Sequence, residues 1–409
     1  MSKFSGKKIL HWIFWIVLVL AVSVITGVVV LLYQANQHKR ELATAIHTNP
    51  GTTAIAAYTI DAYGQPVDDG HAIFANADTP LVMASTMKTI VLAAYEDAVE
   101  RGELDPGEPI AITDLEKHYL PKTDGGAHVA GLAALGLAAD ADGFAKDQSA
   151  TITLDAIARI MIYNSGNAET DYLLARLGAE RLAATMSAAG LEQHTPIHSI
   201  LGITLAMFNH EAPLIDPAQR QELIDEVAGG NFITLEGLAD LYRHDRDWRA
   251  AQLAFMKSDA FPTVANRMGW EGQVAASRLF PKGTAREYAH LMAQIASGQF
   301  ISPAVSARIQ QKLESIPDEQ PMLWFFHQRY GAKGGMTAGV LNLASYAVPK
   351  SGPLAGRTRV VVILTNDLPY EAWVNLAQFQ SIYLLQADLA KAVETFGVEI
   401  ALPNQKRSP

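Results

Sequence analysis

Stretches with the residue pattern of β-strands occur near both ends of this chain, with a long helical middle between them. Residues 52–60 are typical of a strand, and residues 332–337, 340–348 and 359–365 are typical of three more. Between them, from Thr151 to about Leu313, helices alternate with loops. We therefore expect an α+β fold in which one antiparallel sheet is built from both ends of the chain and is flanked by helices, with a mainly helical lobe beside it.

The segment from Ile9 to Tyr33 contains no Asp, Glu, Lys or Arg and is rich in Ile, Val, Leu and Trp. As a helix it would be about 37 Å long, enough to cross a bilayer with some tilt. No small-x-small cleavage site follows it, which favours an uncleaved signal-anchor over a signal peptide. So long an uncharged run is also unusual for a buried core helix. We expect one transmembrane helix.

Lysines precede this segment at positions 3, 7 and 8, while only Lys39 and Arg40 follow it closely. The positive-inside rule then favours, by a small margin, a cytoplasmic N-terminus and a cell-membrane protein with its main domain on the extracellular side. The resulting division is 1–8 cytoplasmic tail, 9–33 transmembrane anchor, 34–51 juxtamembrane linker and 52–403 folded domain.

The formal net charge is −10, which argues against nucleic acid or anionic lipid as the main partner of the folded domain. The chain has no cysteine, so no disulfide can form. No repeat or low-complexity linker divides residues 52–403, which predicts one unit with two lobes. The sequence leaves the oligomeric state open.

Three short motifs follow one another along the chain: Ser85-x-x-Lys88, Ser165-Gly166-Asn167 and Lys333-Gly334-Gly335. The first opens a predicted helix, on which residues three apart share a face. The second lies between two predicted helices, and the third lies on a predicted strand just before its hairpin partner. Each position could line a cleft.

Acyl transfer is the chemistry that uses such a set of groups. A serine hydroxyl attacks a carbonyl when an amine, directly or through a second hydroxyl, accepts its proton. A side-chain amide can hold the substrate amide, and a second lysine can attract a carboxylate. Two backbone N–H groups can then stabilise the oxyanion that develops.

Each motif also has a structural interpretation. Ser85 could simply be a helix N-cap, because serine is a preferred capping residue. In the second motif Gly166 could end one helix and Asn167 could cap the next. Lys333 could be a solvated lysine beside a flexible bend. The order of the motifs and their flanking segments favour the functional interpretation.

With these motifs, the sequence resembles the penicillin-recognising serine enzymes, and among them the class A β-lactamase-like branch, whose signature is S-x-x-K, S-D-N and K-T-G. The resemblance extends from about Thr52 to Gly397. It includes residues 74–78 (Phe-Ala-Asn-Ala-Asp) ahead of the first motif and residues 153–155 (Thr-Leu-Asp) ahead of the second. The terminal strands and final helix fit the same family.

The resemblance implies a serine hydrolase that acts on β-lactams or D-Ala-D-Ala-type, peptidoglycan-like substrates and needs neither cofactor nor metal. Ser85 would be the acylated nucleophile, Lys88 the acylation base and Ser165 the proton relay. The substrate-binding groups would be Asn167 for the amide, Lys333 for the carboxylate, Gly335 on the strand, the Met336 N–H in the oxyanion hole, and Tyr119 as an aromatic wall of the cleft.

The sequence also departs from that branch. Gly166 replaces the usual aspartate, and Gly334 replaces a threonine whose hydroxyl would bind the substrate carboxylate, although Thr337 could compensate. The E-x-x-L-N stretch that carries the deacylating glutamate is absent. Glu211 lies in a partial match that is too late in the chain, and Asp171 replaces the asparagine that braces the glutamate's loop. The long spacing after Ser165 predicts an insertion over about 203–280. We expect acylation to persist and deacylation to be slow.

Histidines at 194 and 198 have helical spacing, but Thr195-Pro196 between them disfavours a helix, so we expect structural roles and no metal site. His128 follows a turn and could approach the cleft. Two alternatives to a β-lactamase-like enzyme stay open. One is a D,D-carboxypeptidase or esterase with slow deacylation, and the other is a non-catalytic sensor of β-lactams or cell wall. The intact Ser85 and Lys88 argue against the sensor.

Overall fold

The computed structural model describes residues 23, 26–27, 29, 50–315 and 321–379. The predicted cytoplasmic tail, nearly all of the transmembrane segment, and residues 34–49 of the linker lie outside the described residues, as does the predicted domain beyond residue 379. Among the residues that are described, no helix has the length and apolar character needed to cross a membrane.

Strands from both ends of the domain form one antiparallel sheet, as predicted. Its order is β2 (Pro66–Val67), β1 (Thr53–Ile60), β10 (Thr358–Thr365), β9 (Val340–Pro349) and β8 (His327–Thr337), and β3 (Ile73–Ala75) also pairs with β1. The register places Ala56 opposite Val362 and Val361 opposite Ser345. The residues of β1 and nearly all of those in β10 are buried, so the sheet has covered faces.

The helices that follow the first strands are α2 (Lys88–Glu100), α3 (Ile112–Leu115), α4 (Ala127–Ala134), α5 (Leu154–Tyr163) and α6 (Asn167–Ala188). The later ones are α7 (Ile200–Phe208), α8 (Pro217–Ala228), α9 (Ile233–His244), α10 (Arg246–Lys257), α11 (Ala260–Ala276), α12 (Ala285–Ser297), α13 (Pro303–Leu313), α14 (Pro321–Phe326) and α15 (Tyr370–Phe379). Two-stranded pairs join β4 (Leu81–Val82) to β7 (Lys282–Gly283) and β5 (Pro109–Ala111) to β6 (Thr151–Thr153).

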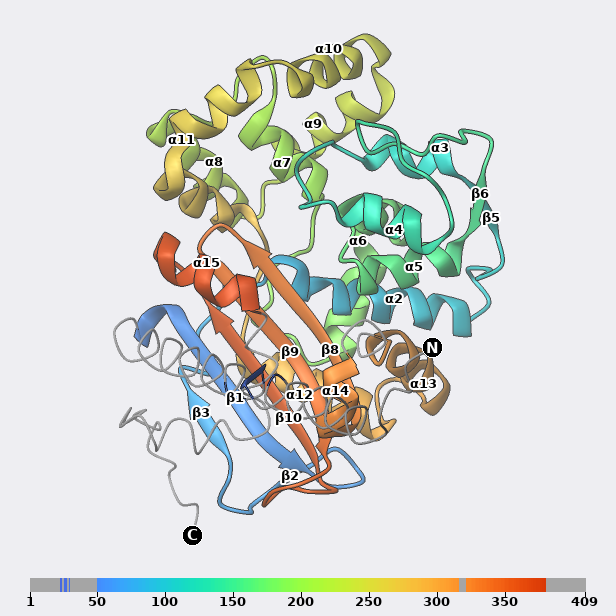
Figure 1. Cartoon of the computed structure of the whole chain (residues 1–409), viewed down its shortest axis with the longest axis vertical. Helices are drawn as coiled ribbons and strands as arrows, with labels where there is room; N and C mark the ends of the chain where they lie inside the picture. The colour runs from blue at the N-terminus through green and yellow to red at the C-terminus, as the bar shows by residue number, and fades with distance from the viewer. Residues whose placement is uncertain (1–22, 24–25, 28, 30–49, 316–320, 380–409) are drawn as a thin grey trace, which may run out of the picture.

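Helix α12 packs against β1, β9 and β10, and Figure 1 shows it behind the sheet while α15 lies in front. Helices α2 to α6 lie beside the β8 edge, and α7 to α11 form the far end of the molecule (Figure 1). One apolar core joins the sheet, α2, α5, α12 and α13. The arrangement confirms the α+β class and the helical lobe.

The segment predicted to contain an insertion, 203–280, includes most of α7 and all of α8 to α11 and has apolar clusters of its own. It also contacts the sheet region, because Val274 lies against Gly339 in the turn between β8 and β9 and Phe280 packs against the cluster that contains Val340. Tyr242 of α9 ties it to the rest of the molecule by donating a hydrogen bond from its hydroxyl to the Tyr119 carbonyl, at 2.6 Å. That the segment is an insertion relative to other family members stays a prediction.

Two element boundaries differ from the sequence-based expectation for clear reasons. Strand β8 begins at His327 instead of Ala332, because Tyr330 is buried and Arg329 forms an ion pair with Glu314 despite the polar character of this stretch. The sequence pattern predicts a helix from Ala168 to about Leu177, but α6 continues to Ala188, although Gly178 interrupts it with a φ of 74°. The turn-rich sequence of residues 103–149 predicts a mostly irregular stretch, but the structure forms β5, α3, η3 (Glu116–His118) and α4 within it.

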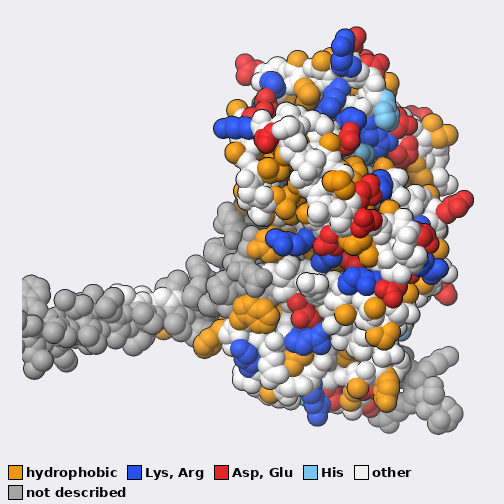
Figure 2. All heavy atoms as spheres, turned by 90° about the vertical axis from the view of Figure 1, so that its right-hand side faces the viewer, with side chains coloured by type: hydrophobic (Ala, Val, Ile, Leu, Met, Phe, Trp, Pro, Cys, Tyr) orange, Lys and Arg blue, Asp and Glu red, His pale blue; other side chains and the backbone are white. Residues whose placement is uncertain are grey.

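Figure 2 shows the face of the molecule that lies to the right in Figure 1. Acidic and basic side chains are mixed over the described part of this face. Ion pairs occur at the surface, as between Arg176 and Glu108, where Arg Nη2 lies 2.7 Å from Glu Oε2. Partly exposed pairs of this kind contribute little to stability.

Candidate active site

The segment that carries Ser85 is held against the sheet by two asparagines. Asn342 of β9 donates from Nδ2 to the Val82 carbonyl at 2.7 Å, and its Oδ1 accepts from the Thr365 backbone. Asn366 accepts from the Val82 N–H at 2.8 Å. Side chains from the C-terminal strands thereby fix β4, and with it the turn that follows.

Ser85 lies in a 3₁₀ turn, η2 (Ala84–Met87), immediately before α2. It does not cap a helix, because the N-cap position of η2 is Met83 and that of α2 is Met87, and neither uses a side-chain hydrogen bond. The hydroxyl of Ser85 makes no hydrogen bond within the described part of the chain. Ala84, just before it, has a φ of 45°, a conformation that costs about 1–3 kcal/mol and persists only where the surroundings impose it.

Lys88 begins α2 and is completely buried. Its Nζ donates to the carbonyl oxygens of Ser165 (2.6 Å) and Gly166 (3.2 Å) and to Oδ1 of Asn167 (2.8 Å). All three acceptors are formally neutral and come from the segment that joins α5 to α6. The first and second sequence motifs therefore form one site.

Burial lowers the pKa of Lys88 to about 7, against the opposing effect of the negative charges of Glu169, Asp171 and Asp124. A lysine with such a pKa is present partly as the free amine near neutral pH. This is the form that a general base requires.

Ser165 connects the two lysines. Its Oγ accepts a hydrogen bond from Lys333 Nζ at 2.8 Å and lies 3.5 Å from Lys88 Nζ. Burial, together with the nearby Lys88, holds the pKa of Lys333 well below its usual value. Ser165 has a φ of 62°, a left-handed conformation that turns the chain between α5 and α6.

Gly335 allows β8 to approach the Ser85 turn. A Cβ at this position would lie 2.5 Å from Thr86 Oγ1, 2.6 Å from the Met83 carbonyl and 2.8 Å from the Thr86 nitrogen, closer than real side chains come. Since β8 is the edge strand of the sheet, its free edge faces η2. The next residue, Met336, has an exposed side chain. All three motifs thus meet at one place.

The structure places Tyr119 in the interior and not on the wall of an open cleft. Its side chain is 3% exposed, stacks on His128 with 4.2 Å between ring centroids, and packs edge-on against Phe144. The prediction that Tyr119 forms an aromatic wall of the cleft is therefore wrong, because the loop that carries Tyr119 folds its ring inward.

Neither carboxylate that the sequence singled out is positioned as a deacylating base. Asp171 is buried and accepts hydrogen bonds from the Ile200 N–H at 2.9 Å and the Leu201 N–H at 2.6 Å, so it braces the start of α7. Burial raises the pKa of Asp171 to about 7 despite these bonds. Glu211 lies beyond α7 with a side chain that is 62% exposed, 3.9 Å from His210.

Sequence reasoning missed a buried cluster behind Lys88 formed by His128, Glu116 and Glu169. His128 Nδ1 lies 2.7 Å from Glu169 Oε1, and Nε2 lies 3.7 Å from Glu116 Oε1. All three side chains are buried. Glu169 is the third residue of α6, where glutamate usually caps the helix from its surface, so sequence alone suggests an exposed role.

The two histidines that the sequence singled out by their spacing, His194 and His198, have structural partners. His194 Nε2 lies 2.9 Å from the Tyr288 hydroxyl, and His198 Nε2 lies 2.8 Å from the Leu279 carbonyl. Over the described ranges, His, Asp and Glu side chains form no group of three that could hold a metal ion.

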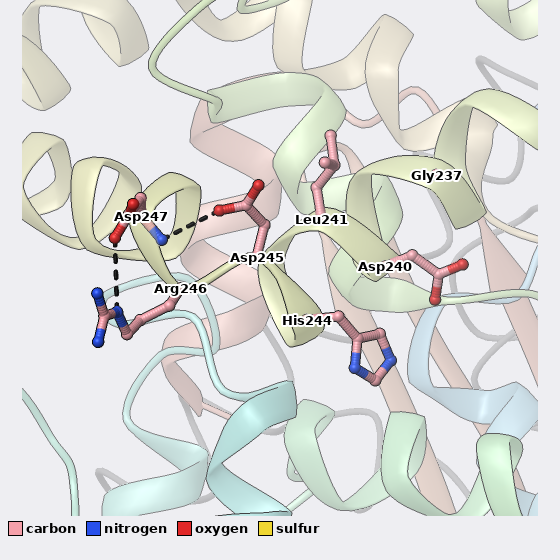
Figure 3. Close-up of a pocket in the computed structure, with 7 residues that line it drawn as sticks. All are labelled: Gly237, Asp240, Leu241, His244, Asp245, Arg246 and Asp247. Carbon is pink, nitrogen blue, oxygen red and sulfur yellow. Dashed lines mark hydrogen bonds and ion pairs between the residues drawn. The ribbon is translucent and has the colours of Figure 1, made fainter.

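A hollow of about 800 Å³ lies elsewhere, at the junction of α9 and α10 (Figure 3). Its charged rim includes Asp245, whose carboxylate accepts from the Asp247 and Trp248 N–H groups and so caps α10. None of the three motifs contributes to it. The hollow is therefore separate from the Ser85 site.

The family model of the Beta-lactamase enzyme family matches residues 37–323, well over half of the chain. The chain belongs to this family, which confirms the resemblance to penicillin-recognising serine enzymes. Among curated proteins, none matches the sequence significantly.

Similar solved structures have low sequence identity. The β-lactamase of Sphaerobacter thermophilus DSM 20745 is 16% identical with a TM-score of 0.48, over 84% of this chain and 95% of that one. A PBP-A mutant in an acyl-enzyme complex with penicillin G is 17% identical with a TM-score of 0.48, over 88% and 97%. The β-lactamase of Francisella tularensis is 13% identical with a TM-score of 0.47, over 85% and 97%.

Proposed function

We propose that this protein is a serine hydrolase that forms an acyl-enzyme at Ser85 with β-lactams or D-Ala-D-Ala-type amides and releases the acyl group slowly. The observation that carries the proposal is the contact of Lys88 with the Ser165-Gly166-Asn167 segment, which Lys333 reaches from the opposite side through Ser165 Oγ. Two buried lysines that share one serine hydroxyl provide a route for protons between nucleophile and leaving group.

In the proposed reaction, Lys88 becomes neutral by giving up one of its three N–H donors, and its lone pair then accepts the Ser85 proton as Ser85 Oγ attacks the substrate carbonyl. Ser165 passes a proton to the leaving nitrogen when the carbon–nitrogen bond breaks, and the Ser85 ester remains. The N–H groups of Ser85 and Met336 stabilise the oxyanion. The close approach of Gly335 to the Thr86 nitrogen supports this, since it brings the two segments together.

The Nζ of Lys333 and the side-chain amide of Asn167 bind the substrate. Asn167 uses Oδ1 for Lys88, and its Nδ2 donates to no other described residue, which leaves an N–H donor for a substrate carbonyl. Lys333 attracts the substrate carboxylate, with Thr337 nearby on the same strand in place of the hydroxyl that Gly334 lacks.

The positions of Asp171 and Glu211 support slow release, and with it the second candidate, a D,D-carboxypeptidase or esterase. The Asp171 carboxylate accepts hydrogen bonds from the Ile200 and Leu201 N–H groups and so orders the start of α7. Both of its oxygens are therefore engaged and are poorly placed to activate a water molecule. Glu211 is exposed beyond the end of the same helix. Hydrolysis of the acyl-enzyme then proceeds without help from either of these two carboxylates.

We also propose that residues 9–33 anchor the protein in the cell membrane as a single-pass helix, with the hydrolase domain on the extracellular side. The uncharged character of this segment supports the anchor. Fractionation of cells that express the full chain, followed by protease treatment of intact cells or spheroplasts, tests both points. Recovery in the soluble fraction, or protection of the domain from external protease, contradicts them.

Incubation with a fluorescent penicillin tests the enzymatic proposal. We expect a covalent adduct in the wild-type protein and none in Ser85→Ala, with folding of both checked by circular dichroism. Turnover of nitrocefin then separates the candidates, because a β-lactamase cycles rapidly whereas a peptidase is acylated and releases product slowly. Binding without any covalent adduct would favour the sensor alternative and contradict the proposal.

A further inference from the structure

We propose that Glu169 is a positioning residue that tunes Lys88 from behind the Gly166 peptide, and that His128 limits this influence as a buried counter-charge. This inference rests on the proposed role of Lys88 as the acylation base. It assigns a function to the polar cluster of His128, Glu116 and Glu169, which the reaction itself does not touch.

Gly166 contacts both Glu169 and Lys88. A Cβ at Gly166 would lie only 1.8 Å from Glu169 Oε2, so the carboxylate occupies the space that a side chain at 166 would need. The carbonyl of the same residue accepts a hydrogen bond from Lys88 Nζ at 3.2 Å. Glu169 is completely buried, and its Oε2 has no hydrogen-bond partner among the described residues. No hydrogen bond from a described residue therefore screens this oxygen, which lies against Gly166.

On its other side, Glu169 forms an ion pair with His128, which Glu116 also approaches. Glu116 is held in turn by the Ala145 N–H at 2.5 Å and by Gln148 Nε2 at 3.1 Å. Burial alone would lower the pKa of His128, but the two carboxylates outweigh it and raise that pKa to about 9. The imidazolium is therefore the main form at neutral pH, and it partly neutralises Glu169.

The charged groups around these residues come from several elements. Lys88 on α2 is near Glu169 and Asp171 on α6, Asp124 before α4, and Lys333 on β8. His128 on α4 is near Glu116 on η3 and Glu169, its ring stacks on Tyr119, and its backbone N–H donates to Asp124 at 2.8 Å. Burial raises the pKa of Asp171 to about 7, so this carboxyl is partly protonated near neutral pH, and Glu169 is the carboxylate best placed to vary the charge at Lys88.

Removal of the Glu169 charge and removal of the His128 charge are expected to shift the pKa of Lys88 in opposite directions. A negative charge at Glu169 favours the protonated form of Lys88, so its removal favours the free amine. Removal of the positive charge of His128 exposes Lys88 to the full negative charge of Glu169 and favours the protonated form. A purely structural role for the cluster would not produce shifts in opposite directions.

The test compares Glu169→Gln and His128→Asn in the full chain through the pH dependence of acylation by a fluorescent penicillin. For Glu169→Gln we expect the acid limb of the profile to move down by about one pH unit, and for His128→Asn up by a similar amount. Glu96→Gln is the matched control, because Glu96 is equally buried, lies on the same helix as Lys88 and pairs with Lys312 and Arg308 instead.

A second readout does not depend on penicillin chemistry. The ¹³C chemical shift of the Lys88 Cε in lysine-labelled protein, assigned with Lys88→Arg, reports the protonation of Lys88 directly. The same opposite shifts of its titration are expected in Glu169→Gln and His128→Asn, with His128→Gln as a replacement if His128→Asn does not fold.

Failure of the two proposals can be told apart. If no adduct forms in the wild-type protein but Lys88 titrates as expected in the variants, the proposed function fails and this inference stands. If both variants leave the titration of Lys88 unchanged, or shift it in the same direction, the inference is overturned whatever the acylation experiment shows.

Discussion

The pKa values of two buried basic side chains in this protein, Lys88 and His128, are shifted in opposite directions. The pKa of Lys88 falls to about 7, whereas that of His128 rises to about 9. Both are completely buried and both have two or three polar partners. The difference lies in the partners, since Lys88 donates to carbonyl and amide oxygens and His128 lies between carboxylates.

The comparison shows how one region can hold a reactive group and its neighbour a fixed charge. Neutral acceptors position an amine but do not offset the free-energy cost of removing its charged form from water, so the amine can be neutral. The negative charges of carboxylates do offset this cost for His128, so its imidazole stays protonated. The first arrangement suits proton transfer, and the second suits structural support.

The largest expected effect follows from removal of Lys88. Lys88→Met should slow acylation of Ser85 by about 10²–10⁴-fold, because Ser85 then lacks its general base. Stopped-flow or gel-based acylation rates with a fluorescent penicillin measure this. Lys312→Met is the control, since Lys312 is also buried but pairs with Glu96 and Asp155. An unchanged acylation rate in Lys88→Met would show that Lys88 is not the general base, and would contradict the comparison of Lys88 with His128.

The second prediction concerns stability against pH. The folded-state pKa of His128, about 9, lies above its usual 6.5, so its stabilising effect is complete below pH 6.5 and is lost as pH rises through 9. We expect His128→Asn to reduce the free energy of unfolding by up to about 3 kcal/mol near pH 6, and by progressively less toward pH 9.

Lys88 should show the reverse dependence. Its folded-state pKa of about 7 lies below the usual 10.5, so its burial is destabilising below pH 7 and this penalty is relieved as pH rises toward 10.5. Denaturant titrations of wild type, His128→Asn and Lys88→Met at several pH values measure both differences. Differences that do not change with pH would contradict the assigned protonation states.

The third prediction concerns the boundary between the two groups. Gly166→Ala should destabilise the fold by about 2 kcal/mol, because the new methyl collides with the Glu169 carboxylate. The backbone itself is compatible with alanine, since φ is −62° and ψ is 133°. In a Glu169→Ala background the cost should largely vanish, as thermal unfolding of the four proteins of the cycle can show. Additive effects would mean that the two residues do not meet.

The smallest effect is expected far from both groups. Arg246 and Asp247 at the rim of the hollow in Figure 3 have side chains that are 95% and 90% exposed, with Arg Nε 3.5 Å from Asp Oδ1. Arg246→Ala should leave the acylation rate unchanged and stability within about 0.5 kcal/mol. A marked loss of acylation would link this hollow to the Ser85 site.

The sequence predicted the sheet, the helical lobe and the meeting of the three motifs, because each of these depends on local periodicity and on short motifs. It could not predict the direction of the Tyr119 ring, which depends on how the loop from 119 to 128 folds against α4. The early start of β8 was missed because long-range partners, and not strand propensity, order residues 327–331.

The cluster behind Lys88 could not be predicted for a different reason. His128, Glu116 and Glu169 are far apart in sequence, and each alone is typical of an exposed turn or helix end. Only the fold brings them together in the interior. The glycine at 166 was recognised as a departure from the family pattern, but its cause, the buried carboxylate of Glu169, was visible only in three dimensions.

The central claim, acylation at Ser85, is tested most directly by mass spectrometry of the protein after incubation with penicillin G. The account predicts a single persistent adduct of the intact penicilloyl mass, mapped to the peptide that contains Ser85 and absent in Ser85→Ala. A folded wild-type protein that stays unmodified, or that carries the adduct on another residue, would contradict it.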